Sequence, residues 1–247
     1  MRLPRRLLQL YVGLALYGAS MALFLRSELG NMPWDVLHQG IARFVPVSFG
    51  TITVITGALV LLCWIPLRQR PGLGTVSNVL VIGVGVDLAL GALPAPAHLA
   101  VRIAFLAAGV VLNAVATACY IGARFGAGPR DGLMTGVVAR YGWPTRRVRT
   151  IIEVAVVAVG FALGGRLGIG TLVYALAVGP LVHPLLPLLR VPERPAGGSE
   201  PRQPSGGGPR GGESDGPVAF GAVRARPDDR ADDLPAVEEQ LVERLPR

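Results

Sequence analysis

Two acidic residues in otherwise apolar sequence, Asp35 and Asp131, are the side chains best placed for binding or proton chemistry. Each follows a proline by two positions, and the two acids are 96 positions apart. An acid at membrane depth is costly and usually marks a pathway for ions, protons or solutes. The same acid can instead be structural, because Asp in the first turn of a helix complements the dipole and accepts free backbone N–H groups. Both interpretations stay open here: a ligand or proton site, or a pair of helix caps.

The residues around the two acids repeat with them. The segment 30–40 reads GNMPWDVLHQG and the segment 126–136 reads GAGPRDGLMTG, so Gly, Pro, Asp, Leu and Gly coincide at equivalent places. Proline suits the first turn of a helix, and glycine permits a tight turn before it or close helix packing after it. The pattern predicts a broken helix in each segment, with the break and packing positions at Gly30, Pro33, Gly40, Gly126, Pro129 and Gly136.

A further matching stretch, 70–75 against 166–171, keeps the same offset. A duplicated membrane unit that breaks its helices at equivalent points is typical of transporters, in which the substrate binds between the repeats. The repeat therefore predicts a site for an unknown small solute, with Asp35, Asp131 and Trp34 as candidate contacts. Trp34 has a second interpretation as an anchor at the membrane–water interface.

Asp87 is the most deeply placed acid of the apolar segments. Arg102 lies at nearly the same depth on the next, antiparallel segment, and charges within a membrane usually pair. We therefore expect an Asp87–Arg102 ion pair that joins the two repeats. The alternative is that Asp87 titrates or binds substrate, and its equivalent in the second repeat, His183, is also ionisable.

Other kinds of chemistry have no support in the residues. Cys63 and Cys119 lie in apolar segments without paired or metal-ligand spacing. The chain has no glycine-rich phosphate loop, no His-Glu-x-x-His and no Gly-x-Ser-x-Gly motif. We expect no catalytic residue, no metal and no cofactor, and hence a protein that is not an enzyme.

The composition indicates a membrane protein. Apolar residues make up 51% of the chain, and the mean hydropathy is +0.49. Positions 1–190 hold only five acids but sixteen arginines. The sequence pI near 10.6 would suggest nucleic acid as the partner of a soluble protein. Here the arginines flank apolar segments, where lipid headgroups account for them, so we expect membrane lipids and no nucleic acid.

Six segments are long enough to cross a bilayer, and two shorter ones follow the duplicated motifs. The predicted spans are about 7–26, 48–67, 74–93, 99–122, 148–165 and 169–189. The short segments, about 33–44 and 129–141, are too short to cross unaided. They fit re-entrant Pro-x-Asp helices, which survive at membrane depth only when packed against protein or lining a cavity.

Arginine placement sets the orientation. If the short segments do not cross, all but four arginines of the membrane part face the cytoplasm. Those four are Arg26, Arg43, Arg102 and Arg166. Each repeat, about 7–93 and about 99–190, then has three spans, and an odd number makes the repeats inverted. The prediction is an all-α integral protein of the inner membrane with six transmembrane helices and both termini in the cytoplasm.

The character of the chain changes after the transmembrane domain, residues 1–191. Residues 192–227 are rich in Pro, Gly, Ser, Arg and Glu with almost nothing to bury, which is typical of disorder. We expect a disordered cytoplasmic tail over 192–247. Within it, 233–245 carries Leu and Val at helical spacing, which fits either a short helix that binds a protein partner or transient helicity.

The motifs at 29–37 and 126–134, LGNMPWDVL and GAGPRDGLM, resemble those of the YczE/YyaS/YitT family of bacterial multi-pass membrane proteins. The resemblance covers about 7–190 and includes both motifs in order. It implies an inner-membrane protein of five or six spans. It implies no activity and does not extend to the acidic tail.

Two functions compete on these observations. A small-solute permease would use the interface between inverted repeats for alternating access, with the short segments as gates. A non-transporting scaffold or accessory protein would use the same helices as a platform and bind a partner through its tail. The duplicated helix breaks favour the permease.

Overall fold

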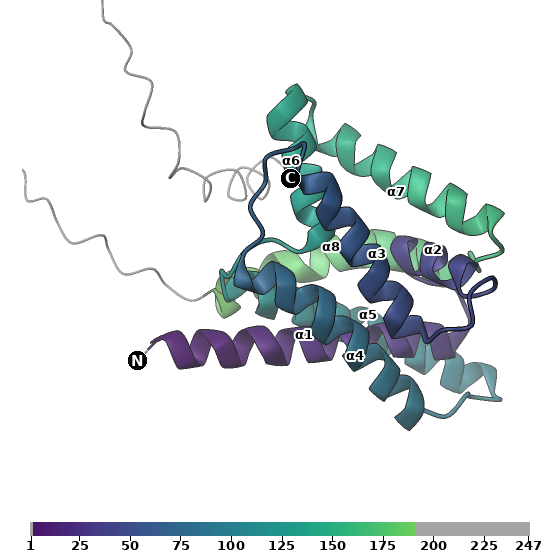
Figure 1. The fold of residues 1–247 in the computed structure, drawn as a ribbon. Coiled ribbons are helices and arrows are strands. Elements are labelled where there is room, and N and C mark those ends of the chain that lie inside the picture. The colour runs from purple at the N-terminus through teal and green to yellow at the C-terminus, as the bar shows by residue number, and fades with distance from the viewer. Residues whose placement is uncertain (1, 191–247) are drawn as a thin grey trace, which may run out of the picture. The chain divides into compact units, whose positions relative to one another are not determined.

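The computed structural model describes residues 2–190, and this part of the chain is helical throughout, with no strand (Figure 1). Its eight helices are α1 (Arg2–Ser27), α2 (Pro33–Ile41), α3 (Phe49–Trp64), α4 (Leu73–Ala92), α5 (Leu99–Gly122), α6 (Pro129–Tyr141), α7 (Thr145–Ala162) and α8 (Ile169–Leu189). The chain divides into two units, 1–191 and 192–247. The expected disordered tail and its short helix at 233–245 lie outside the described residues.

The helix boundaries follow the sequence repeat. Helices α2, α3 and α4 begin 96 positions before α6, α7 and α8. Pro33 and Pro129 each take the first helical position, where the missing N–H costs nothing. Gly30 and Gly126 precede them with φ angles of 127° and 111°, a conformation that glycine adopts without strain. At each motif the chain therefore changes direction, and a new short helix begins.

Helices α1 and α5 pack against each other at the centre of the helical unit, with α4 on α1 and α8 on α5. The order of their contacts shows that α1 and α5 are antiparallel. Near the start of α1, Arg6 donates to the carbonyl of Ala123, just beyond the end of α5. In the middle, the Asn113 amide donates to the Ser20 hydroxyl at 3.0 Å. The equivalent helices of the two repeats thus run in opposite directions.

Contacts at the two ends of this pair are equivalent. Arg6 Nε donates to the carbonyl of Ala123 at 3.0 Å, and Arg102 Nε donates to the carbonyl of Ser27 at 2.7 Å. Arg102 stands 96 positions after Arg6, and Ala123 stands 96 positions after Ser27. The same contact therefore occurs at both ends of the α1–α5 pair.

The two halves also interlock through their short helices. The N–H of Gly74 donates to the carbonyl of Phe125 at 2.9 Å, and the N–H of Gly170 donates to the carbonyl of Leu29 at 2.8 Å. Helix α2 of the first half packs on α7 of the second, while α6 of the second half packs on α3 of the first. Figure 1 shows α2 beside α7 and away from the N-terminal end of α1. The backbone at each helix break is therefore hydrogen-bonded to the other half of the chain.

One pair of helices departs from this equivalence. Helix α3 packs closely on α4, whereas their counterparts α7 and α8 have almost no contact with each other. Helix α8 is held mainly by α5, and α7 is held by α2 and α6. The second repeat is thus more open than the first.

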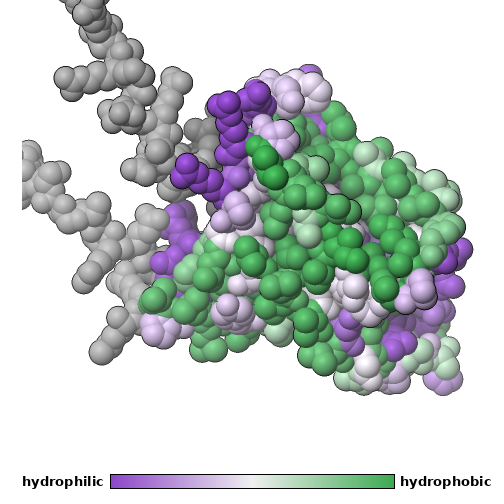
Figure 2. Space-filling view, in the orientation of Figure 1, coloured by the Kyte–Doolittle hydropathy of each residue, from purple (hydrophilic) through white to green (hydrophobic). Residues whose placement is uncertain are grey.

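Four helices are long and apolar enough to cross a membrane: residues 3–27 of α1, and α4, α5 and α8. Helix α3 is apolar but has only 16 residues. Helix α7 is less apolar because charged side chains occupy its first turns. The six spans expected from the sequence are therefore matched in part. Figure 2 shows apolar side chains over the visible flank of the helices and hydrophilic ones toward their ends.

Candidate functional site

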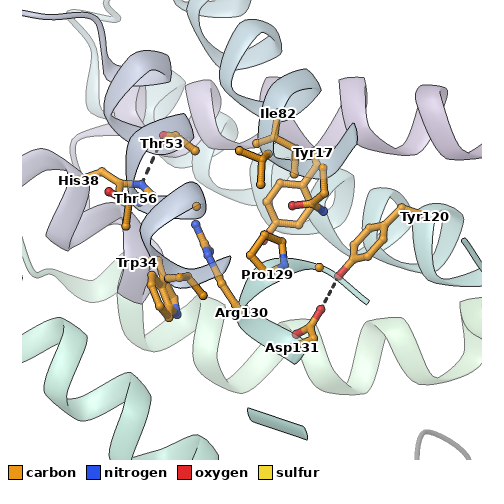
Figure 3. Close-up of a pocket in the computed structure, with 15 residues that line it drawn as sticks. Tyr17, Trp34, His38, Thr53, Thr56, Ile82, Tyr120, Pro129, Arg130 and Asp131 are labelled. Carbon is orange, nitrogen blue, oxygen red and sulfur yellow. Dashed lines mark hydrogen bonds between the residues drawn. The ribbon is translucent and has the colours of Figure 1, made fainter. Parts of the chain in front are cut away.

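A small cavity lies where the starts of α2 and α6 meet α1, α3, α4 and α5 (Figure 3). Its volume is about 70 Å³, room for a few water molecules or a small solute. Trp34 comes from the first repeat motif, and Arg130 and Asp131 come from the second. The duplicated motifs, far apart in the sequence, therefore line the same cavity.

Arg130 is the cation of this cavity. Its guanidinium carbon lies 5.0 Å from the centre of the Trp34 ring, within the range of a cation–π contact. One of its terminal nitrogens lies 3.8 Å from an oxygen of Asp35. The Arg130 side chain is 27% exposed, so part of the guanidinium remains open to the cavity. Arg130 thus links the two motifs through one ring and one carboxylate.

Asp35 is fully buried, and neither of its carboxylate oxygens accepts a hydrogen bond. The Nδ1 atom of His38 lies 3.3 Å from one of them, close but not aligned as a hydrogen bond. The same Nδ1 atom also lies 3.4 Å from the hydroxyl of Thr53 in α3. Within the described residues Asp35 therefore makes no capping hydrogen bond to α2, although it lies in the first turn, beside the positive end of the helix dipole. A buried carboxylate held only by nearby charge is the costlier arrangement.

Asp131, the equivalent acid, has a different environment. Its carboxylate accepts a hydrogen bond from the Tyr120 hydroxyl at 2.8 Å (Figure 3). The Tyr120 ring packs edge-on against Tyr17, with centroids 6.2 Å apart, and both tyrosines line the cavity. The two acids of the repeat are therefore no longer chemically equivalent: one is buried among charges, and the other is hydrogen-bonded at the cavity wall.

Several residues of the site were missed by the sequence reasoning. Arg130, His38, Tyr17 and Tyr120 were not proposed as contacts, yet all four line the cavity. A signal for Arg130 was present, because it occupies the place of Trp34 in the second motif and that place had already been singled out. For the two tyrosines, on α1 and α5, the sequence carried no such signal.

The expected ion pair between Asp87 and Arg102 is wrong. Asp87 accepts hydrogen bonds from the Ser48 hydroxyl at 2.5 Å and from the N–H of Gly50 at 2.7 Å. Arg102 instead donates to the carbonyl of Ser27 and pairs with Glu28 at 3.2 Å. The free N–H groups at the start of α3 attract the Asp87 carboxylate, and depth alone could not reveal that competitor. Asp87 does not line the cavity.

The charges at the cavity nearly cancel. The starts of α2 and α6 both lie at the cavity, and each brings the positive end of a helix dipole. With Arg130 they oppose the two carboxylates. Within residues 2–190, no group of three or more His, Cys, Asp or Glu side chains is placed to hold a metal ion. The arrangement can hold a small polar solute by hydrogen bonds and charge.

Comparison with known proteins places the chain in a family. The model of a family of unknown function, DUF6198, matches residues 4–186, which include both motifs and all of the cavity. The chain belongs to this family. The match covers nearly all of the helical unit, whereas residues 187–247 lie beyond it.

Individual relatives agree with that assignment. An uncharacterized protein of Haemophilus influenzae is 37% identical over 187 residues, which cover 75% of this chain and 86% of that protein. The uncharacterized membrane protein YczE of Bacillus subtilis is 30% identical over 72% of this chain and 83% of its own length. YyaS of the same organism is 25% identical over 72% and 90%. The resemblance to YczE and YyaS is confirmed, and with the apolar helices it supports a membrane location. No solved structure matches the chain.

Proposed function

We propose that this protein is a small-solute permease of the bacterial inner membrane and that its solute binds in the cavity between the duplicated motifs. The observation that carries the proposal is the meeting of Trp34 and Arg130, the same position of the two motifs, at one cavity. Sites of this kind, built where two repeats bring broken helices together, are typical of transporters.

The architecture that we infer is a pair of inverted repeats. The antiparallel course of α1 and α5 supports it, because equivalent helices of inverted repeats must cross the membrane in opposite directions. The parallel course of α4 beside α1, and of α8 beside α5, fits three crossings in each repeat. On this proposal α3 and α7 also cross, and α2 and α6 are re-entrant helices that enter from opposite faces.

The orientation that we propose places both termini in the cytoplasm. The arginine bias of the sequence supports it. Exposed apolar residues on the outer helices, for example Leu80, Leu88, Leu172 and Leu176, then face lipid tails. Arginines at the helix ends face anionic headgroups, so membrane lipids are the expected surroundings.

The permease is tested by capture of solutes. Purified protein is reconstituted into sealed vesicles and offered a mixture of small metabolites extracted from bacteria, and the trapped solutes are identified by mass spectrometry. We expect at least one solute to accumulate with the wild-type protein and not with the same amount of folded Arg130→Gln protein. Arg140→Gln is the matched control, because Arg140 is exposed and outside the cavity. If folded wild-type protein traps the same solutes as protein-free vesicles, the permease is contradicted.

A scaffold that binds a protein partner through 192–247 makes the opposite prediction. Removal of those residues would then abolish the cellular function of the protein, and Arg130→Gln, compared at equal amounts of folded protein, would leave it intact. The buried Asp35 carboxylate, 3.8 Å from the cavity-lining Arg130, favours the permease, because a scaffold has no need to bear the cost of a buried charge.

A further inference from the structure

One pair of glycines shows how the two repeats differ. Gly83 in α4 and Gly179 in α8 are 96 positions apart and therefore equivalent. A Cβ atom at Gly83 would collide with Val54 and would lie 2.8 Å from the carbonyl oxygen of Gly50, both in α3. A Cβ atom at Gly179 would meet no atom of the described part of the chain within 4 Å. The same residue is thus needed for close packing in one repeat and stands in open space in the other.

A glycine inside a helix needs a reason. Relative to alanine it costs about 1 kcal/mol, because the backbone of glycine is freer in the unfolded chain. Close contact with α3 supplies the reason at Gly83. No contact in this conformation supplies it at Gly179, although α7 is the helix that corresponds to α3.

A pair of threonines differs in the same direction. The Thr75 hydroxyl, at the start of α4, donates to the carbonyl of Ala127 at 2.8 Å and accepts from the N–H of Gly72. Its equivalent, the Thr171 hydroxyl at the start of α8, is buried and has no hydrogen-bond partner within residues 2–190. Buried hydroxyls are nearly always paired. The start of α8 therefore lacks an anchor that the start of α4 possesses.

The face of α8 that corresponds to the α3-facing side of α4 is uncovered. Val79 and Ile82 are buried, whereas their equivalents Ala175 and Val178 are exposed and half-buried. Three prolines lie within α8, Pro180, Pro184 and Pro187, and the equivalent part of α4 has none. Proline weakens the hydrogen bonding of a helix and permits a bend. Helix α8 can therefore bend at its prolines, whereas α4 has no proline at the equivalent positions.

The opposite side of the gap, on α7, is polar. Arg149 pairs with Glu153 at 3.0 Å, and the two stand at the positions of Thr53 and Gly57, which line the central cavity. A polar face of this kind is suited to water rather than to lipid tails.

We propose that α8 is the mobile helix of the second repeat, and that in a second, closed conformation it packs against α7 as α4 packs against α3. Gly179 and Ala175 are then the contact residues of the closed state, as Gly83 and Val79 are for α3 and α4. The inference rests on the proposed permease. It states which repeat is open in the present conformation and which helix moves.

A disulfide trap tests the closing movement. In a chain with Cys63→Ser and Cys119→Ala, the pair Glu153→Cys and Ala175→Cys is placed in vesicles and oxidised with copper phenanthroline. These positions correspond to Gly57 and Val79, which are in contact in the first repeat. We expect the cross-link to form. The matched control pairs Ala155→Cys with Ala175→Cys, since Ala155 is exposed two positions along α7 and points away from Glu153.

The outcomes separate this inference from the permease itself. A cross-link in the Glu153 pair alone supports the movement, while no cross-link, or equal cross-linking of the control, overturns it. With a solute found by the vesicle assay, the cross-linked protein should lose at least nine-tenths of its uptake and regain it with reductant. Uptake that is unchanged by the cross-link means that the movement of α8 has no part in transport. Absence of uptake in every variant, with a normal cross-link, contradicts the permease and leaves the movement standing.

Discussion

The guanidinium of Arg130 lies over the ring of Trp34, 5.0 Å from its centre, and the two residues hold the same position in the two copies of one motif. On the proposed two-fold relation between the repeats, equivalent residues can touch only near its axis. This contact therefore marks the place where the halves meet. There the chemistry has diverged: one copy supplies a cation, and the other supplies the aromatic face that receives it.

Removal of the Arg130 charge should destabilise the fold through Asp35. Arg130→Gln leaves a fully buried carboxylate without the cation 3.8 Å away, at a cost of about 3 kcal/mol in the free energy of unfolding. The melting temperature in detergent should fall. Adding Asp35→Asn removes the uncompensated charge and should restore part of the loss. Simple addition of the two single effects would show that the residues are not coupled.

Loss of the Tyr120 hydroxyl should affect Asp131 specifically. Tyr120→Phe removes the hydrogen bond of 2.8 Å to this carboxylate, and a hydrogen bond to a charged group contributes about 2 kcal/mol. We expect a lower melting temperature for Tyr120→Phe and an unchanged one for Tyr141→Phe, whose ring is exposed. In Asp131→Asn protein the effect of Tyr120→Phe should shrink, and an undiminished effect would mean that Tyr120 acts elsewhere.

Asp87 should stabilise the start of α3 independently of Arg102. Asp87→Ala removes the acceptor of the Ser48 hydroxyl and of the Gly50 N–H, which should cost about 2 kcal/mol in unfolding free energy. Because Arg102 contacts Ser27 and Glu28 instead, combination with Arg102→Gln should give the sum of the two effects within about 0.5 kcal/mol. If denaturation curves showed that one substitution rescues the other, they would support the ion pair that the sequence predicted.

The two equivalent glycines should respond in opposite ways to the same change. Gly83→Ala forces a methyl group against Val54 and the backbone of Gly50, and such overpacking costs about 1–3 kcal/mol. Gly179→Ala meets no atom and should stabilise α8 by up to about 1 kcal/mol. Thermal melts of the two variants decide the matter, and equal destabilisation would mean that Gly179 is packed in the dominant state.

The sequence predicted the local structure well, because the strongest signals were local. Proline at the first helical position and glycine with positive φ determine where α2 and α6 begin, and both are visible in the residues themselves. The helix boundaries shared by the two repeats follow from that pattern. The two halves were therefore recognised before any contact between them was known.

The site was harder to predict because it depends on which helices meet. Tyr17 and Tyr120 lie within apolar helices, and only the packing of α1 against α5 brings them to the cavity. Asp87 and Arg102 matched in depth, yet the nearer partner of Asp87 is the start of α3, whose position depends on close packing at Gly50 and Gly83. Depth along a helix carries no information about the direction in which a side chain points.

The hydrogen bond from the N–H of Gly170 to the carbonyl of Leu29 affects how the protein can fold during its synthesis. When the first repeat has just been synthesised and inserted, the Leu29 carbonyl is present, but its donor, the Gly170 N–H, is not. The Gly74 N–H likewise lacks its acceptor until the Phe125 carbonyl has been synthesised. The first half must therefore remain unfinished during translation, with polar backbone that water or the insertion machinery has to shelter. Folding is completed only when the last helix arrives, so the two halves mature together or not at all.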